Sequence, residues 1–164
     1  MSTYRGQTPP SSPVDPRIIS FFEHFYAVSD NPTAHEEYAQ LLTADADFIM
    51  GSKKVQGYDA ILAARKALWS GPVQTRHHKL DKIFPFGQGS REVMLYGTVD
   101  YGLKNGKAVS IDWAGKAVLV DVDGELKMAF YQVYLSFKST PTSMPQSPEP
   151  RAPSPEPMLE VCKS

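Results

Sequence analysis

The 164-residue chain is long enough for one domain with terminal extensions. Its formal net charge is −1 and its 17 Lys and Arg residues are scattered, so the basic surface of a nucleic-acid binder is excluded. The one cysteine, Cys162, excludes an intramolecular disulfide and a zinc site built from several cysteines. No segment approaches 18 apolar residues and no signal peptide is evident. We therefore expect a soluble, cytoplasmic protein that binds neither nucleic acid nor membrane.

The composition divides the chain into three parts. Residues 1–14 are rich in Ser, Thr and Pro, and residues 139–164 are rich in Pro. Neither stretch carries enough apolar surface to offset the entropy lost on ordering, so both are predicted to be disordered. Residues 15–138 are predicted to form a single folded domain.

Three helices are predicted in the first half of this domain. Asp15-Pro16 is a typical helix start, and the apolar positions from Ile18 to Val28 follow at helical spacing until Asp30-Asn31-Pro32 ends the pattern. Thr33 and Glu36 have the spacing of a capping box, which predicts a second short helix. A third helix is predicted to follow Gly57 and to end at Ser70-Gly71-Pro72.

After Pro72 the apolar pattern changes to the alternation of β-strands. Four long strands are predicted, and two of their links contain Asn105-Gly106 and Asp123-Gly124, which favour tight hairpins. A short strand at 46–50, with a second at 53–56, is expected to join this meander. The predicted class is α+β, with three helices covering the concave face of a curved antiparallel sheet. The long strands are placed at 74–86, 91–103, 107–121 and 125–138.

This order of elements resembles the nuclear transport factor 2 superfamily, whose members share a cone-shaped α+β fold. The resemblance covers nearly all of 16–138 and includes the Val55-Gln56-Gly57-Tyr58-Asp59-Ala60-Ile61 turn into the third helix and the closing Asp123-Gly124-Glu125-Leu126. These motifs identify a fold and carry no catalytic signature. The resemblance implies a cavity between the helices and the sheet.

Two branches of the superfamily imply different functions. SnoaL-like proteins, which resemble polyketide cyclases, are cofactor-free cyclases, isomerases and dehydratases of secondary metabolism that use His, Asp or Tyr side chains of the cavity as acid and base. Nuclear transport factor 2 itself is a dimeric carrier without enzymatic activity. SnoaL-like enzymes often place an acid after a glycine of the third meander strand, where this chain has Ala117. A domain that kept the fold and lost the chemistry is therefore a third alternative.

His78 is the predicted acid or base. Strand alternation sends His77 and His78 to opposite faces, and His78 shares its parity with the apolar Leu80 and Phe84. A neutral imidazole is suited to proton transfer near pH 7. Arg76 has the same parity, so it is expected near the mouth of the cavity. Hydrogen bonding of His78 within the core is the alternative.

Two further residues are candidates for partners of His78. Asp112 lies in the apolar run around Ile111 and Trp113, where burial would raise the pKa of its carboxyl group. We predict Asp112 or Tyr96 as the orienting or electrophilic partner of His78. Exposure of Asp112 to solvent is the alternative.

The remaining candidates would line the cavity and bind a small apolar or aromatic ligand. The last strand is apolar on both parities, which predicts that one face meets the cavity and the other a second subunit of a homodimer. No phosphate loop, zinc spacing or nucleophile elbow is present, so no cofactor and no metal are predicted. The predicted ligand-binding residues are Phe22, Phe25, Arg76, Trp113, Tyr131 and Tyr134.

The sequence therefore predicts a SnoaL-like protein that binds a small molecule. If it is an enzyme, it is expected to be a cofactor-independent isomerase, cyclase or dehydratase. The alternative is a dimeric carrier or protein-binding module that resembles nuclear transport factor 2.

Overall fold

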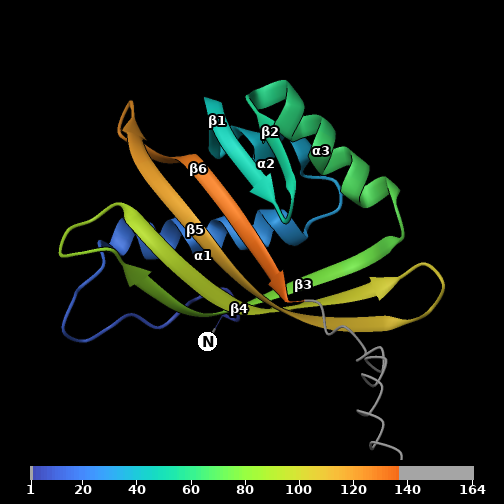
Figure 1. Cartoon of the computed structure of the whole chain (residues 1–164), viewed down its shortest axis with the longest axis horizontal. Helices are drawn as coiled ribbons and strands as arrows, with labels where there is room; N and C mark the ends of the chain where they lie inside the picture. The colour runs from blue at the N-terminus through green and yellow to red at the C-terminus, as the bar shows by residue number, and fades with distance from the viewer. Residues whose placement is uncertain (1, 137–164) are drawn as a thin grey trace, which may run out of the picture.

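The computed structural model describes residues 2–136, which form three helices and one six-stranded sheet. The helices lie toward one face of the curved sheet (Figure 1). The predicted tail at 139–164, with Cys162, lies outside the described residues. The elements are α1 (Pro16–Asp30), α2 (His35–Gln40), β1 (Leu42–Met50), β2 (Lys53–Gln56), α3 (Tyr58–Ser70), β3 (Val73–Pro85), β4 (Glu92–Leu103), β5 (Ala108–Val122) and β6 (Glu125–Ser136).

Helix α1 begins as the sequence predicts. The Asp15 side chain accepts a hydrogen bond from the backbone N–H of Arg17, and Pro16 occupies the first turn. Ile18, Phe22, Phe25 and Tyr26 are almost fully buried, because they form the stripe that faces the sheet. This stripe brings the C-terminal end of α1 over β3.

Helix α2 departs from its predicted start. It begins at His35, and its N-cap position is Ala34, which makes no side-chain cap. Thr33 instead donates from both its backbone N–H and its hydroxyl group to the side-chain oxygen of Asn31. The expected capping box therefore does not form, because Asn31 closes the turn after α1 and engages Thr33 first.

The sheet has the order β2-β1-β6-β5-β4-β3. The four long strands form the predicted antiparallel meander, and Asp123, Gly124 and Gly106 have the positive φ angles that its tight turns need. The short strand β1 starts at Leu42, earlier than predicted, and pairs in parallel with β6. The sheet is therefore mixed, and β1 and β2 extend it beside the last strand of the chain.

The N-terminal segment differs from the prediction of disorder. Residues 3–7 lie along β3: the backbone N–H of Leu80 donates to Thr3, and that of Ile83 donates to Gln7. Gly6 packs so closely on Leu80 and Ile83 that a Cβ atom there would lie 2.9 Å from Leu80. Composition does not predict that this segment is ordered, because backbone hydrogen bonds to an edge strand hold it rather than its own apolar side chains.

The core is aromatic and lies between α1 and the sheet. Phe25 contacts Tyr38 and Tyr131, with ring centroids 5.1 and 5.3 Å apart respectively, and Tyr26 lies 5.1 Å from Trp113.

Within residues 2–136, no helix has the length and apolar character required to cross a membrane. The same residues contain no group of three His, Cys, Asp or Glu side chains placed to hold a metal ion.

Candidate active site

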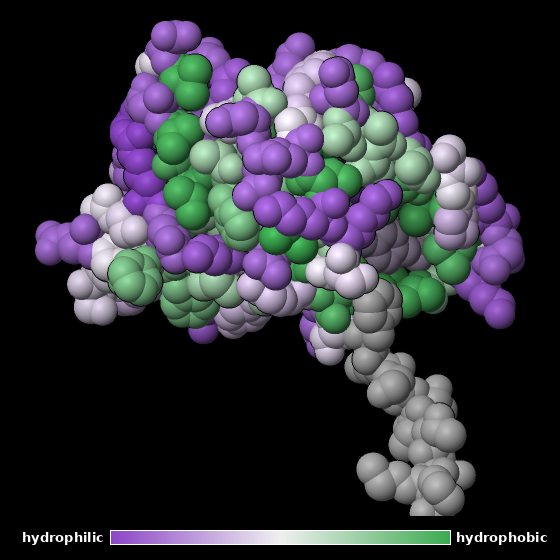
Figure 2. Space-filling model, turned by 45° about the horizontal axis from the view of Figure 1, so that its top comes forward, coloured by the Kyte–Doolittle hydropathy of each residue, from purple (hydrophilic) through white to green (hydrophobic). Residues whose placement is uncertain are grey.

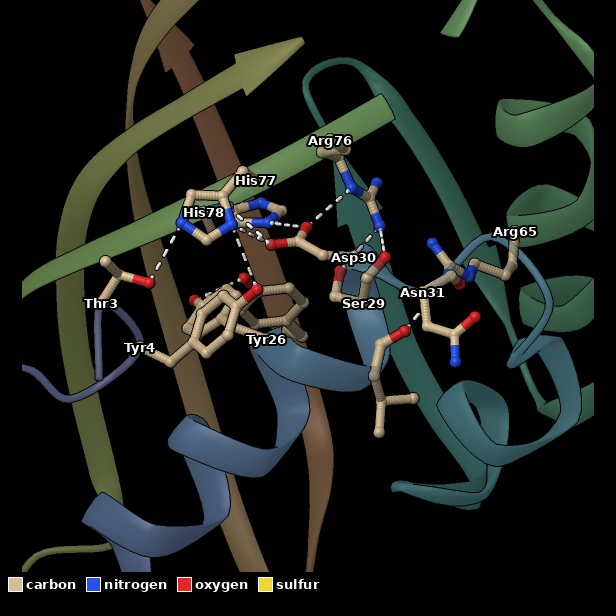
Figure 3. A network of polar contacts seen from close by, with 12 residues as sticks. Thr3, Tyr4, Tyr26, Ser29, Asp30, Asn31, Arg65, Arg76, His77 and His78 are labelled. Atoms are coloured by element: carbon tan, nitrogen blue, oxygen red, sulfur yellow. Dashed lines mark hydrogen bonds and ion pairs between the residues drawn. The ribbon is translucent and has the colours of Figure 1, made fainter. Parts of the chain in front are cut away.

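A histidine and an aspartate meet where the end of α1 crosses β3 (Figure 3). Nδ1 of His78 lies 2.6 Å from Oδ1 of Asp30, and the backbone N–H of His78 donates to Oδ2 of the same carboxylate at 2.6 Å. The side chain of Asp30 is only 6% exposed and that of His78 is 12% exposed. Asp30 and His78 are therefore joined by two buried hydrogen bonds, both strengthened by the charge of the carboxylate.

Arg76 holds the same carboxylate from the other side. Its Nε lies 3.3 Å from Oδ1 of Asp30, and its Nη2 donates to both the hydroxyl and the backbone carbonyl group of Ser29. Arg76 and His78 are two residues apart on β3, so alternation directs both toward α1. Asp30 is thus fixed by two side chains of one strand.

These contacts determine the protonation of the pair. Burial alone would raise the pKa of Asp30, but the hydrogen bonds from His78 and the charge of Arg76 lower that pKa overall. Burial lowers the pKa of His78 despite the opposing effect of Asp30. Asp30 is therefore ionised and His78 neutral near pH 7, so Nδ1 carries the proton and donates to Asp30. The basic atom is then Nε2.

A cavity of about 30 Å³ lies beside His78. This is room for about one water molecule. In its wall the hydroxyl groups of Tyr26 and Tyr131 lie 3.0 Å apart, and burial raises the pKa of both phenols. Nε1 of the buried Trp113 has no acceptor among the described residues. The cavity thus combines one base with hydrogen-bond donors.

Comparison with known proteins identifies the fold. No family model and no curated protein matches the sequence. Among solved structures, Aln2 from a Streptomyces species is 19% identical with a TM-score of 0.60, covering 73% of this chain and 91% of its own. Nuclear transport factor 2 from Cryptosporidium parvum is 14% identical with a TM-score of 0.60, covering 76% and 99%. The chain has the nuclear transport factor 2-like fold.

The hexachlorocyclohexane dehydrochlorinase LinA type 2 shares this fold, with 13% identity, a TM-score of 0.63, and coverage of 74% of this chain and 84% of its own. The fold that the resemblance implied is thereby confirmed. The α+β class and the cone of helices over a curved sheet are confirmed with it.

Within the nuclear transport factor 2-like cone, the structure gathers some of the predicted residues. His78, Arg76, Trp113, Phe25 and Tyr131 line the small cavity. Phe22 is fully buried in the core but does not line the cavity.

Three predicted residues lie on the opposite face of the sheet. Asp112 is exposed, because its neighbour Trp113 points inward and strand alternation turns Asp112 outward. Tyr96 and Tyr134, at 39% and 46% exposure, are aligned on either side of Ala114 on that outer face. The predicted partnership of His78 with Asp112 or Tyr96 is therefore wrong, and Asp30 contacts His78 instead.

The sequence contains a pattern that indicates a buried role for Asp30. We interpreted Asp30 only as part of the end of the first helix. Asp30 follows Tyr26 by four residues, so helical periodicity continues the buried stripe onto a carboxylate. A charged group at the end of an apolar stripe needs a buried partner. Ser29, Tyr38 and Tyr101 were also missed as residues that line the cavity.

His77 lies outside the cavity wall. Its ring nitrogens lie 3.1 Å from the Thr3 hydroxyl group and 3.2 Å from that of Tyr4, and its Nδ1 is 4.0 Å from Asp30. Burial and the neighbouring Asp30 raise the pKa of Tyr4 to about 12. The N-terminal segment therefore covers the outer side of the Asp30 carboxylate.

Proposed function

We propose that the protein is a cofactor-independent acid–base enzyme in which His78 removes a proton from a carbon atom of a small substrate. The observation that carries this proposal is the 2.6 Å contact between His78 and the ionised, buried Asp30. Asp30 fixes the tautomer with the proton on Nδ1, which leaves the lone pair of Nε2 as the base. It also stabilises the imidazolium that forms when the proton arrives.

Three related classes of reaction satisfy this proton balance. As the C–H bond breaks, its electron pair forms a double bond within the substrate, and the proton moves to Nε2 of His78. In an isomerisation the proton returns to another atom of the substrate. In a cyclisation the enolate attacks a second carbonyl carbon, whose C=O double bond opens, and the oxygen of that group takes the proton from His78. In a dehydration the proton leaves with the departing hydroxyl group as water. Nε1 of Trp113 and one of the two phenols, Tyr26 or Tyr131, supply donors for an oxygen that gains negative charge, because the other phenol donates within their mutual hydrogen bond.

The proposal agrees with what one structural neighbour does. LinA is by name a dehydrochlorinase, and elimination of HCl also requires removal of a proton from carbon. The cavity at His78 is too small for such a substrate, so most of a ligand must lie beside it. Tyr38, Met50 and Arg76 separate this cavity from a larger one, and Met50 has a flexible side chain that can repack.

Proton exchange tests this proposal and does not require the substrate to be identified. A panel of β-hydroxy ketones and β,γ-unsaturated ketones is incubated with the protein in deuterium oxide, and loss of C–H signals is followed by NMR. We expect exchange or turnover with the wild-type protein and a reduction of about 10²-fold or more in His78→Gln. The matched control Asp112→Asn, on the outer face, should exchange like wild type. Equal rates in His78→Gln and wild type would remove His78 from the chemistry.

A second candidate, a dimeric carrier or protein-binding module, is favoured by the outer face of the sheet. Phe84, Met94, Tyr96 and Tyr134 are each between 39% and 46% exposed, and the rings of Phe84 and Tyr96 are stacked 6.0 Å apart. Such an exposed apolar row across neighbouring strands suits a homodimer interface. Light scattering should then give the mass of a dimer for wild type and of a monomer for Tyr134→Glu, with Lys107→Glu as a control at a distant turn.

A further inference from the structure

A second cavity lies between α3 and the strands β1 and β2. Its volume is about 280 Å³, close to the lower end of typical small-molecule sites at roughly 300 Å³. Most of its wall is apolar, including Phe48, Val55, Ile61 and Leu68. On the side of the molecule that carries β1, β2 and α3, apolar residues lie between hydrophilic ones (Figure 2). The cavity is therefore suited to the apolar body of a small molecule.

The charged side chains around this cavity all have one sign. Lys53, Arg65 and Arg76 line it, and no acidic side chain among the described residues does. Arg65 is 4% exposed and Arg76 is 7% exposed, so two of the three cations are buried. Among residues 2–136 the one buried acidic group that contacts either of them is Asp30, which contacts Arg76 and also His78.

Arg65 has no acidic partner within residues 2–136. Its Nη2 donates to the backbone carbonyl groups of Val28 and Asn31, at 3.2 and 2.7 Å, and its Nε and Nη1 have no acceptor among the described residues. Burial and the charge of Arg76 lower the pKa of Arg65 to about 10. A buried guanidinium without a carboxylate is energetically costly, and a bound anion would offset part of that cost.

Both guanidinium groups contact the ring of Trp69. The guanidinium carbon atoms of Arg65 and Arg76 lie 5.2 and 5.0 Å from the ring centre of Trp69, and that of Arg65 lies 4.8 Å from Tyr38. Cation–π contacts of this kind fix the planes of both groups without neutralising their charge. The result is a rigid, positively charged wall on an otherwise apolar cavity.

We propose that this cavity binds a small apolar or aromatic carboxylic acid, with its carboxylate held by Arg65 and Arg76 and its apolar body packed against Phe48, Val55 and Leu68. Guanidinium groups recognise carboxylates through paired N–H donors. The binding site itself does not depend on the proposed acid–base reaction. Only the further step, that such an acid is the substrate of His78, rests on the proposed function. Arg76 connects the two, because it lines both cavities.

A binding measurement tests the ligand class on the full chain. 3-Phenylpropionate and octanoate are titrated by calorimetry and compared with their primary amides, which have nearly the same shape and no charge. We expect both acids to bind, and each amide to bind at least about tenfold more weakly, because it cannot offset the buried cations. Equal affinity for acid and amide, or no binding of either acid at millimolar concentration, would overturn the proposal.

A pair of variants on α3 locates the site without altering its charge. Ala64 lines the cavity, whereas the adjacent Ala63 is exposed on the helix. Ala64→Leu should fill the space and reduce the affinity for 3-phenylpropionate at least tenfold, whereas Ala63→Leu should bind it like wild type. Retained affinity in Ala64→Leu would place the ligand elsewhere and contradict the proposal.

Arg65→Gln tests the charge, and phenyl phosphate tests the anion. Arg65→Gln should lose at least about tenfold in affinity for the acids and little for the amides, provided its melting curve is cooperative. Phenyl phosphate binding more tightly than both acids would replace the carboxylate in the proposal by a phosphate ester. The binding measurement does not depend on the chemistry of His78, so acid binding by a protein that fails the proton-exchange test would contradict the proposed reaction alone.

Discussion

Asp30, the last residue of α1, accepts two hydrogen bonds from His78 on β3, one from the ring and one from the backbone, each 2.6 Å long. Because one contact comes from the backbone, the carboxylate is held against the strand whatever the rotamer of the imidazole. The end of a helix and the middle of a strand thus form one rigid unit. Everything proposed for the chemistry depends on this contact.

Asp30→Asn should preserve the shape of this unit and remove its charge. The amide cannot stabilise an imidazolium, so we expect turnover to fall by about 10²-fold or more, with little change in KM. The pH profile should also change, because Asp30 raises the pKa of His78 and its loss would move the acidic limb of kcat/KM to lower pH. Asp81→Asn, on the bulge of β3, is the control. An unchanged acidic limb would show that Asp30 does not act through His78.

Arg76→Met should destabilise the fold. Asp30 would stay buried and lose its ion pair with Arg76, and only His78 would remain as its buried side-chain partner. Breaking a buried ion pair in this way costs about 3–5 kcal/mol of unfolding free energy. Removing the exposed pair of Arg5 and Glu23 by Arg5→Met should cost less than about 1 kcal/mol. Urea unfolding of both variants measures the difference. Equal losses would mean that the contact of Arg76 with Asp30 contributes no more than a surface ion pair.

The sequence predicted the elements of the fold because each rests on local chemistry. The start of α1 at Pro16, the hairpin turn at Asp123-Gly124 and the alternation of β4 are properties of neighbouring residues. His78 and Trp113 were placed correctly on the inner face for the same reason, since strand parity follows from the apolar pattern.

The partner of His78 could not be obtained in this way. Asp30 and His78 are 48 residues apart, and only the crossing of α1 over β3 brings them together. Asp112 was favoured because it has apolar neighbours in sequence, but alternation in a strand directs it away from them. The N-terminal segment was missed for a related reason, because its contacts with β3 are made by backbone groups, which composition does not reveal.

Acid should destabilise the protein in two stages. The folded-state pKa of His78 lies below its ordinary 6.5, so the unfolded chain takes up a proton first and stability falls as the pH decreases below about 6.5. The folded-state pKa of Asp30 lies below its ordinary 3.8, so a second loss follows below about pH 4. Urea unfolding between about pH 7 and pH 5 measures the first stage.

His78→Gln should flatten the first stage, apart from a residual slope from His35, whose pKa burial also lowers. The double variant with His35→Gln accounts for that slope. A wild-type stability that does not change over this range would contradict the lowered pKa of His78.

Deletion of residues 2–7 should expose the amides of β3 that the N-terminal segment protects. The N–H groups of Leu80 and Ile83 donate to carbonyl groups of Thr3 and Gln7, and no side chain is needed for either bond. Hydrogen exchange at these two amides should therefore accelerate in the deletion variant, while the amide of Val99, on β4, stays protected. Gln7→Ala keeps the backbone bonds and should retain wild-type protection. If Leu80 and Ile83 exchange equally slowly with and without residues 2–7, the segment does not hold this edge in solution.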